Sequence, residues 1–344
     1  MRCSLLIYDG NDGQIQSGLG PWEKFPEWKQ KALLDEDPEA KSKIMTLHQI
    51  FRDIEINLVE VSSYKECVEM IQTTHVLVVC KGIVDHHLLE KAVNLKEIHV
   101  LGNNVDKIDT KEIHKRGINF ITHPMTNFLA VAEHTVTLML AATKKLPKSD
   151  RIVREASSWM VVPGGIPLLR NLTIGLLGVG EIGYEVIRLL KPWGCRIIYY
   201  DIDRKNYLEK ELGPHYVSWV ELFKESDILS LHLPLNEDTI SVVSNDSISL
   251  MKPNSIIINT ARGELINEDA LMAAMVSNRI HGAGLDVFAT EPLPADHPFT
   301  KMENVILTPH CAWASPWTLV NDAQSLLSKV ASSIQTNYYS RMTE

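Results

Sequence analysis

The chain of 344 residues has no long hydrophobic run and no excess of positive charge. None of its apolar runs approaches the roughly 20 residues that a helix needs to cross a bilayer. Its net charge of −9 argues against nucleic acid or an anionic membrane as the main partner. The N-terminus shows no signal-peptide cleavage pattern, so we expect a cytoplasmic protein.

Cysteine is scarce as well. The five cysteines are odd in number and form no C-x-x-C pair, which favours reduced thiols over disulfides or metal ligands. They are Cys3, Cys67, Cys80, Cys195 and Cys311. The sequence therefore predicts no metal site. Internal repeats and low-complexity tracts are also absent, and the length allows two domains, each with its own core.

A β-α-β unit spans residues 172–201. The short apolar run 174–177 predicts a buried strand, apolar residues at helical spacing follow it as far as Pro192, and a second strand-like run ends at Asp201. Three glycines between the first strand and the helix have the spacing G-x-G-x-x-G: Gly178, Gly180 and Gly183. The strand, the helix and the terminal acid around them disfavour the alternative of a plain glycine-rich turn.

This unit predicts a site for a dinucleotide. Gly178 permits the tight turn, Gly180 lets a pyrophosphate approach the backbone, and Gly183 lets helix and strand pack closely. The free N–H groups and the positive end of the helix dipole face the phosphates. Asp201 is placed to accept hydrogen bonds from the ribose 2′-hydroxyl, which favours NAD over NADP. Two basic residues just beyond it offset part of that preference: Arg204 and Lys205.

Strands and helices alternate through most of the chain, which indicates an α/β protein with doubly wound parallel sheets. The predicted strands are 3–8, 57–61, 75–80, 97–101, 119–121, 227–232, 255–259, 282–287 and 304–308. The predicted helices are one or two within 22–52, broken near Pro38, then 64–71, 86–93, 109–115, 219–225, 267–277 and 317–338. A very apolar helix is expected over 128–146, buried between domains or at a subunit interface. Residues 11–20 are expected to form a loop.

Three polar residues each follow one of the later strands. Arg262 stands just beyond the first, Glu291 beyond the next and His310 beyond the third. Loops at the carboxyl ends of parallel strands line one crevice, so we expect these side chains to converge beside the nicotinamide ring. An arginine that anchors a carboxylate, a histidine that exchanges a proton and a glutamate that orients it suit reduction of a 2-oxo acid. Each residue alone also has an ordinary alternative. Arg262 would pair with a cofactor phosphate, Glu291 would be a solvated loop charge, and His310 would be a buried structural histidine.

Several segments together resemble the D-isomer-specific 2-hydroxyacid dehydrogenase family. They are VAEHTVTLMLA, LLGVGEIG, LHLPLNEDT, NTARGELINEDAL, GLDVFATEPLP and LTPHCAWAS. The resemblance implies that Arg262 binds substrate carboxylate and carbonyl, and that Glu291 supports His310 as the acid/base. It also implies a Rossmann cofactor domain, 123–315, inserted into a flavodoxin-like substrate domain, 1–122 with 316–344. Members usually form dimers through the long apolar helix, which here is 128–146.

The resemblance further implies positions for both ligands. The cofactor-binding candidates are Gly178, Gly180, Glu181, Ile182, Gly183, Asp201, Pro234, Thr239, Thr260, Ala261 and Asp286. The substrate-binding candidates are Lys81, Gly102, Asn103, Asn104 and Trp313. Lys81 is a candidate second cation for an acidic substrate, with a solvated lysine as the alternative.

The substrate is less defined. Asn103 and Asn104 stand where the family commonly has a small residue and a glycine, which indicates a small or unusual substrate. Glu291 argues against formate as the substrate, because formate dehydrogenases of this family have glutamine at that position. A tryptophan three residues after His310, here Trp313, is a feature that the chain shares with glyoxylate and hydroxypyruvate reductases and with the family's corepressors. Residues 10–55 are longer than expected and would cap the cleft or contact a partner.

The sequence predicts an NAD(H)-dependent enzyme that interconverts a small 2-oxo acid and its D-2-hydroxy acid. A rival hypothesis is an NAD-sensing binding protein of the corepressor kind, which a peptide groove built from 10–55 would favour. A third is a family member that acts on an unusual acid.

Overall fold

The computed structural model describes residues 4–9, 25, 27–53, 56–102, 105–155 and 165–339. The chain folds into two compact units, which we call the terminal unit (1–127 with 314–344) and the central unit (128–313). The sequence predicted that the central segment runs from 123 to 315. That the central unit binds the cofactor and the terminal unit the substrate stays a prediction. Among the described residues, no helix is both long enough and apolar enough to cross a membrane.

The terminal unit contains a five-stranded parallel sheet with the order β2-β1-β3-β4-β5. Its strands are β1 (Ser4–Asp9), β2 (Asn57–Val61), β3 (Val76–Lys81), β4 (Glu97–Leu101) and β5 (Asn119–His123). This is the flavodoxin-like strand order. The side chains of β1 alternate, so that Leu6 and Tyr8 face one layer of helices while Leu5 and Ile7 face the other.

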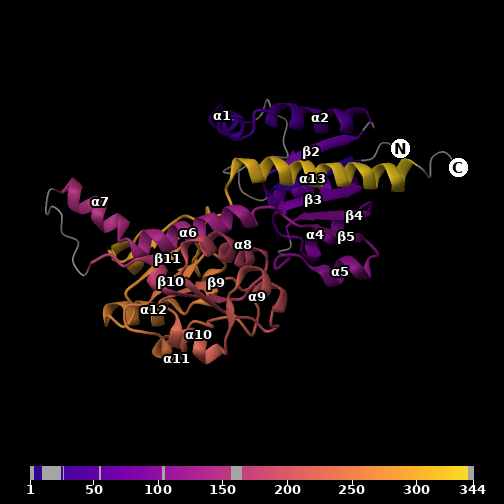
Figure 1. The fold of residues 1–344 in the computed structure, drawn as a ribbon. Coiled ribbons are helices and arrows are strands. Elements are labelled where there is room, and N and C mark those ends of the chain that lie inside the picture. The colour runs from indigo at the N-terminus through magenta and orange to yellow at the C-terminus, as the bar shows by residue number, and fades with distance from the viewer. Residues whose placement is uncertain are drawn as a thin grey trace. The chain divides into compact units, whose positions relative to one another are not determined.

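Helices cover both faces of this sheet (Figure 1). One face packs on α3 (Tyr64–Met70), α4 (His86–Lys91) and α5 (Thr110–Lys115). The other packs on α13 (Pro316–Ile334), whose buried stripe includes Leu326, Leu327 and Val330. The helix nearest the end of the chain is therefore part of the core of the unit that the N-terminal strands form.

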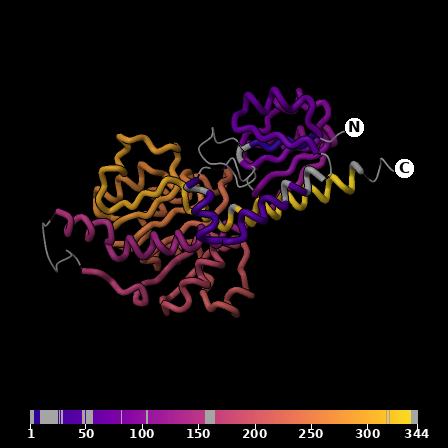
Figure 2. The backbone as a smooth tube through the Cα atoms, turned by 90° about the horizontal axis from the view of Figure 1, so that it is seen from above, coloured from indigo at the N-terminus to yellow at the C-terminus, as the bar shows by residue number. Residues whose placement is uncertain are grey.

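A helical hairpin packs on α13 and adds a third set of helices to the terminal unit. It consists of α1 (Glu27–Glu36) and α2 (Ala40–Asp53), which are separated near Pro38 as predicted. Leu33 and Ile44 pack with Val320 of α13 in a small separate core. Figures 1 and 2 show α2 and α13 side by side, although they are far apart in the sequence. Of the long segment 10–55, residues 10–24, 26, 54 and 55 lie outside the described residues.

The central unit contains a seven-stranded parallel sheet with the order β12-β11-β10-β9-β6-β7-β8. The strands are β6 (Thr173–Leu177), β7 (Arg196–Tyr200), β8 (His215–Tyr216), β9 (Ile228–Leu231), β10 (Ile256–Asn259), β11 (Gly282–Leu285) and β12 (Val305–Leu307). The direction of winding reverses between β6 and β9, as in the Rossmann fold, and ligands bind such sheets at this switch point.

The two faces of this sheet are covered by different helices. One face packs on α6 (Phe128–Thr143), α8 (Glu181–Leu190) and α9 (Asn206–Leu212). The other packs on α10 (Trp219–Glu225), α11 (Asn245–Leu250) and α12 (Glu268–Val276). The predicted fold class, α/β with two doubly wound parallel sheets, is confirmed.

The predicted helix 128–146 is wrong at its end. Helix α6 stops at Thr143, Lys145 adopts a left-handed conformation with φ of 51°, and a second helix, α7 (Leu146–Arg154), begins. Pro147 lies in the first turn of α7, where its missing N–H costs nothing, so a new helix begins there readily. The two helices also differ in composition, because α6 is mostly apolar and α7 carries several charged residues.

Candidate active site

The glycine-rich turn between β6 and α8 has the geometry that the sequence predicts. Gly178 has a φ of +85°, and a Cβ there would lie 2.8 Å from the carbonyl oxygen of His232. A Cβ on Gly183 would lie 3.0 Å from the carbonyl oxygen of Gly178, so helix and turn are closely packed. Gly180, at the N-cap of α8, differs: apart from Gly180 itself and its two chain neighbours, no heavy atom of the described residues lies within 4 Å of its Cβ position. Open space therefore adjoins the free N–H groups of α8, which fits a bound phosphate.

Asp201 follows β7 and turns back toward this glycine loop. Its Oδ2 accepts a hydrogen bond from the Val179 N–H at 2.8 Å, and its Oδ1 accepts one from the Asp203 N–H at 3.2 Å. The Lys205 ammonium lies 3.8 Å from Oδ1. The carboxylate is thus held beside the turn that would contact a dinucleotide.

Other predicted cofactor positions are held by bonds within the central unit. Thr260 is buried, and its Oγ1 lies 2.7 Å from that of Thr135 on α6. Thr239 donates its hydroxyl to the Pro234 carbonyl at 2.7 Å. The Ala261 N–H donates to Oδ1 of Asn259 at 3.0 Å. Glu181 is exposed and Ile182 half-buried in the first turn of α8. The hydroxyls of Thr239 and Thr260 therefore help to fix the loops in which they lie.

His310 and Glu291 form a direct pair. The Nδ1 atom of His310 lies 2.7 Å from Oε2 of Glu291, and the other oxygen of Glu291 accepts a bond from the Phe288 N–H at 3.1 Å. The two side chains are 42% and 35% exposed, so they lie at an accessible surface of the central unit. A glutamate on Nδ1 fixes the ring and leaves Nε2 for another partner. The sequence predicted a glutamate that orients this histidine, and the two side chains lie in contact.

Arg262 follows β10 in a loop that packs against the loop of Glu291. A Cβ on Gly263, the next residue, would lie 1.9 Å from the carbonyl carbon of Phe288, so only glycine fits there. Asn259 closes the turn by donating its side-chain amide to the Arg262 carbonyl at 2.8 Å. The guanidinium is half-buried and donates to the Ala261 carbonyl at 2.7 Å. The loops of Arg262 and Glu291 are therefore joined by close backbone contact.

Asp286, predicted as a cofactor contact, anchors the loop that bears His310. This fully buried carboxylate accepts bonds at Oδ1 from the Thr308 hydroxyl (2.5 Å) and the Cys311 N–H (3.0 Å). Its Oδ2 accepts one from the Ala312 N–H at 3.0 Å. His134 of α6 extends the network through a contact of 3.0 Å with the Thr308 hydroxyl. Sequence reasoning missed this anchoring role, although a lone aspartate directly after a buried strand is a signal for it.

The donor atoms of His134, Asp286 and Cys311 lie within 4.8 Å of one another, as ligands of a metal ion do. Both oxygens of Asp286 already accept hydrogen bonds from the loop. Burial and the neighbouring Asp286 also raise the pKa of the Cys311 thiol, which opposes the thiolate that a metal binds. The arrangement favours a hydrogen-bonded anchor.

The predicted substrate-binding residues fall in both units. Trp313 belongs to the central unit, and its indole N–H donates to the His310 carbonyl at 2.8 Å. Gly102 belongs to the terminal unit, where it has a φ of +88° and its N–H donates to the His123 carbonyl at 2.7 Å. Asn103, Asn104 and the side chain of Lys81 lie outside the described residues.

The family of the chain follows from comparison with known proteins. The family model for "D-isomer specific 2-hydroxyacid dehydrogenase, NAD binding domain" matches residues 136–312, more than half of the chain. The chain belongs to the D-isomer-specific 2-hydroxyacid dehydrogenase family. It is thus an oxidoreductase with an NAD-binding domain, and the predicted family and enzyme class are confirmed.

Relatives of this 2-hydroxyacid dehydrogenase include a glyoxylate reductase of Korarchaeum cryptofilum. The two are 39% identical over 236 residues, which cover 67% of this chain and 71% of that protein. A D-lactate dehydrogenase of Aquifex aeolicus, solved with NAD and lactic acid, is 27% identical with a TM-score of 0.76, covering 97% of this chain and 96% of that one. An acyclic imino acid reductase solved with NADPH and D-Arg is 27% identical with a TM-score of 0.74, covering 96% and 97%. The fold thus accommodates either dinucleotide.

Proposed function

We propose that this dehydrogenase uses NADH to reduce a small 2-oxo acid to its D-2-hydroxy acid, and that it also catalyses the reverse reaction. The observation that carries the proposal is the contact of 2.7 Å between His310 and Glu291. The pair lies in the same unit as the glycine-rich turn and Asp201, and its loop packs against the loop of Arg262. A carboxylate anchor, an oriented proton donor and a dinucleotide site make up the set that this reaction needs.

Each residue has a distinct part in the reductive direction. The guanidinium of Arg262 binds the substrate carboxylate through its planar fork of donors. Because Nδ1 of His310 is held by Glu291, its Nε2 donates the proton to the carbonyl oxygen. The bound nicotinamide supplies the hydride that C2 receives. Hydride and proton together convert the carbonyl at C2 to a hydroxyl group.

We assign NAD(H) as the cofactor in preference to NADP(H). The negative Asp201 is suited to the two ribose hydroxyls and repels a 2′-phosphate. Glyoxylate and hydroxypyruvate are the first candidates for the substrate. The relative from K. cryptofilum is named as a glyoxylate reductase, and the pair of asparagines at 103 and 104 favours a small acid.

The test is the loss of NADH absorbance across a panel of 2-oxo acids. The panel comprises glyoxylate, hydroxypyruvate, pyruvate, 2-oxobutyrate, oxaloacetate and phenylpyruvate. Rapid turnover of one or two members is expected, with kcat lowered at least about a hundredfold in His310→Ala. Tight NADH binding without turnover of any member would contradict the proposal.

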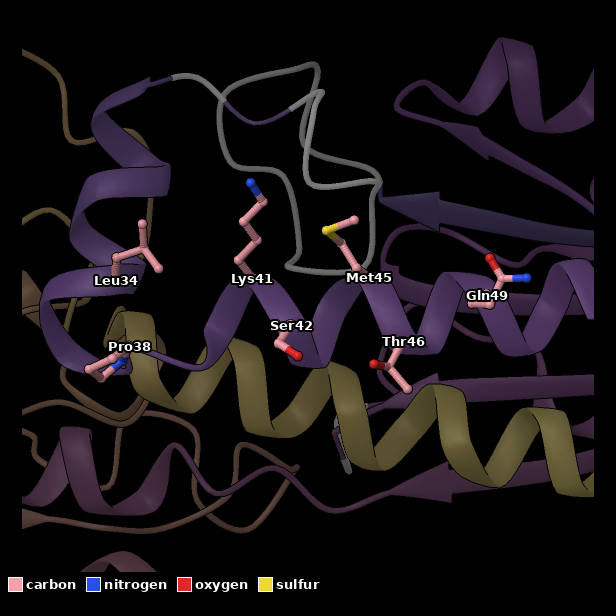
Figure 3. Close-up of a pocket in the computed structure, with 7 residues that line it drawn as sticks. All are labelled: Leu34, Pro38, Lys41, Ser42, Met45, Thr46 and Gln49. Carbon is pink, nitrogen blue, oxygen red and sulfur yellow. The ribbon is translucent and has the colours of Figure 1, made fainter.

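A groove in the terminal unit favours a second candidate, the NAD-sensing binding protein. It measures about 600 Å³ and lies on α1 and α2 (Figure 3). Its lining is mixed in polarity and comprises Leu34, Pro38, Lys41, Ser42, Met45, Thr46 and Gln49. The enzyme remains the first proposal because Arg262, Glu291 and His310 are all present. A protein that binds NADH tightly and reduces no member of the panel would favour the sensor.

We also propose that two chains assemble through α6 and α7. One face of α6 packs in the core of its own unit, through residues such as Val136 and Met139. None of the nine residues of α7, all of them described, is buried. Leu146 is 59% and Val153 60% exposed, and Figure 1 shows α7 extending away from the rest of the central unit. An exposed amphipathic helix that continues a core helix suits a symmetric interface.

A further inference from the structure

Two basic residues follow Asp201 closely, although this end of β7 is expected to repel a 2′-phosphate. An arginine near that position is the group with which proteins accommodate the phosphate of NADP. Arg204 is permanently charged and its side chain is 56% exposed. Preference for NADH therefore requires that Arg204 be kept from the phosphate.

Glu209 of α9 holds this arginine. The Nε atom of Arg204 donates to Oε1 of Glu209 at 2.8 Å, and a terminal nitrogen donates to Oε2, also at 2.8 Å. This is the bidentate geometry that a phosphate would otherwise receive. The guanidinium carbon also lies 5.6 Å from the centre of the Tyr216 ring, which adds a cation–π contact.

Glu209 is itself fixed by the core. Its Oε1 accepts a hydrogen bond from the hydroxyl of Tyr199 at 2.9 Å, and the ring of Tyr199 is fully buried. The same hydroxyl accepts the N–H of Lys205 at 2.8 Å, so one buried tyrosine sets both the glutamate and the loop. The bond from Arg204 lowers the pKa of Glu209 to about 2, which keeps the carboxylate charged at all ordinary pH values.

We propose that Glu209 is a specificity-determining residue, which withholds Arg204 from a 2′-phosphate and so maintains preference for NADH. This inference rests on the proposed cofactor site. Asp201 repels the phosphate directly, while Glu209 acts by occupying the donors that would bind it. Neutralising Glu209 frees the guanidinium and removes one negative charge beside the site.

The experiment compares the dissociation constants of NADH and NADPH for the whole protein, measured by fluorescence titration, which needs no substrate. In Glu209→Gln, NADPH should bind about tenfold or more tightly than in the wild type, which is the effect of one charge-assisted hydrogen bond. NADH binding should change little. Adding Arg204→Ala to Glu209→Gln should abolish the gain, because the gain requires the guanidinium.

Glu211→Gln is the matched control. Glu211 lies on the same helix, and its carboxylate accepts a bond from Tyr184, 2.6 Å away on α8. The substitution Glu211→Gln removes the same charge without freeing Arg204. The ratio of the dissociation constants of NADH and NADPH should therefore stay near that of the wild type. An equal shift in Glu211→Gln would overturn the proposal, as would an unchanged ratio in Glu209→Gln. Failure of the wild type to bind either dinucleotide would instead refute the proposed function.

Discussion

His310 has a backbone conformation that histidine seldom adopts, with a φ of 51°. Three hydrogen bonds hold it there: its N–H donates to the carbonyls of Asp286 and Thr308, and its own carbonyl accepts the indole N–H of Trp313. Such strain is typical of functional sites, because the surrounding structure has to impose it. The buried Asp286 helps to impose this conformation, because its carbonyl binds the N–H of His310 and its carboxylate binds the next two N–H groups.

Replacing His310 tests the proton donor directly. His310→Ala should lower kcat by about 10²- to 10⁴-fold, the usual contribution of a positioned acid or base. The dissociation constant of NADH should stay near that of the wild type, because the glycine-rich turn is untouched. Steady-state kinetics and fluorescence titration measure the two. Loss of NADH binding would indicate a structural histidine instead.

Arg262→Lys tests the carboxylate anchor while retaining the positive charge. Lysine lacks the planar fork, so kcat/KM for the 2-oxo acid should fall by about a hundredfold, the effect of losing two charge-assisted bonds. The dissociation constant of NADH should be unaffected. Kinetics with the best substrate of the panel decide the matter, and an unchanged kcat/KM would remove the role assigned to this arginine.

At the scale of elements, the loops around the site depend on close backbone packing. Gly263→Ala would place a methyl group 1.9 Å from the carbonyl carbon of Phe288 and force apart the loops of Arg262 and Glu291. We expect a loss of about 1–3 kcal/mol in the free energy of unfolding, as for other overpacked sites. Urea denaturation measures it. Native stability in this variant would contradict the tight packing.

Gly180→Ala should behave in the opposite way. The added methyl group meets open space in the protein, so the free energy of unfolding should stay close to that of the wild type. The same methyl group would occupy the space left for a pyrophosphate, and the affinity for NADH should therefore fall at least about tenfold. Titration with NADH measures this change. Unaltered affinity would show that the dinucleotide lies elsewhere.

The elements of this chain differ in how far the sequence predicts them. Long, strongly apolar strands such as β3 and β6 are predicted because buried parallel strands have continuous apolar runs. The short elements α9, α11 and β8 were not predicted, and the two residues of β8 give no periodicity at all. The break after Thr143 was missed, although the change from apolar to charged residues at Lys144 and the proline at position 147 both mark it.

The same contrast holds for the candidate site. Strand-end position alone brought Arg262, Glu291 and His310 together, since parallel strands share one carboxyl edge. The anchoring network of Asp286, Thr308 and His134 depends on contacts between residues 22 and 174 positions apart, which no local pattern encodes. The pairing of Arg204 with Glu209 depends on the orientation of α9, an element that the sequence did not reveal.

For the molecule as a whole, a buried histidine in the terminal unit predicts how stability depends on pH. A ring nitrogen of His123 lies 2.9 Å from one of His99, and the other ring nitrogen of His99 contacts the carboxylate of Glu97. That carboxylate also accepts hydrogen bonds from Ser333 and Asn337. Burial, together with the nearby His99 and Lys329, lowers the pKa of His123 to about 4. The unfolded chain therefore binds more protons than the folded one between that value and the ordinary pKa of about 6.5.

Stability should accordingly fall as the pH drops from about 6.5 to about 4. The contribution of His123 is about 1–3 kcal/mol at the acid end, since one pKa unit corresponds to about 1.4 kcal/mol. In His123→Asn the dependence should be shallower, as measured by urea denaturation across this range. His86→Asn, at a histidine whose side chain is 66% exposed, serves as the control. Equal slopes in the wild type and His123→Asn would exclude the effect.

The proposed assembly makes a further prediction for the molecule. Light scattering coupled to size-exclusion chromatography should give twice the mass of one chain, which is 38.8 kDa. Replacing both Leu146 and Val153 by Asp should yield monomers with unchanged secondary structure, because these side chains are exposed within the single chain. A monomeric wild type, or a dimer that survives both substitutions, would place the interface elsewhere or exclude it.

The contribution of α13 to the terminal unit has a consequence for synthesis on the ribosome. The five strands of that unit are complete by His123, but the helix that covers Leu5 and Ile7 begins only at Pro316. At about 5–20 residues per second, an apolar sheet face is left uncovered for on the order of ten seconds or more while the central unit emerges and folds. The nascent chain is then a substrate for chaperones until its final helix arrives.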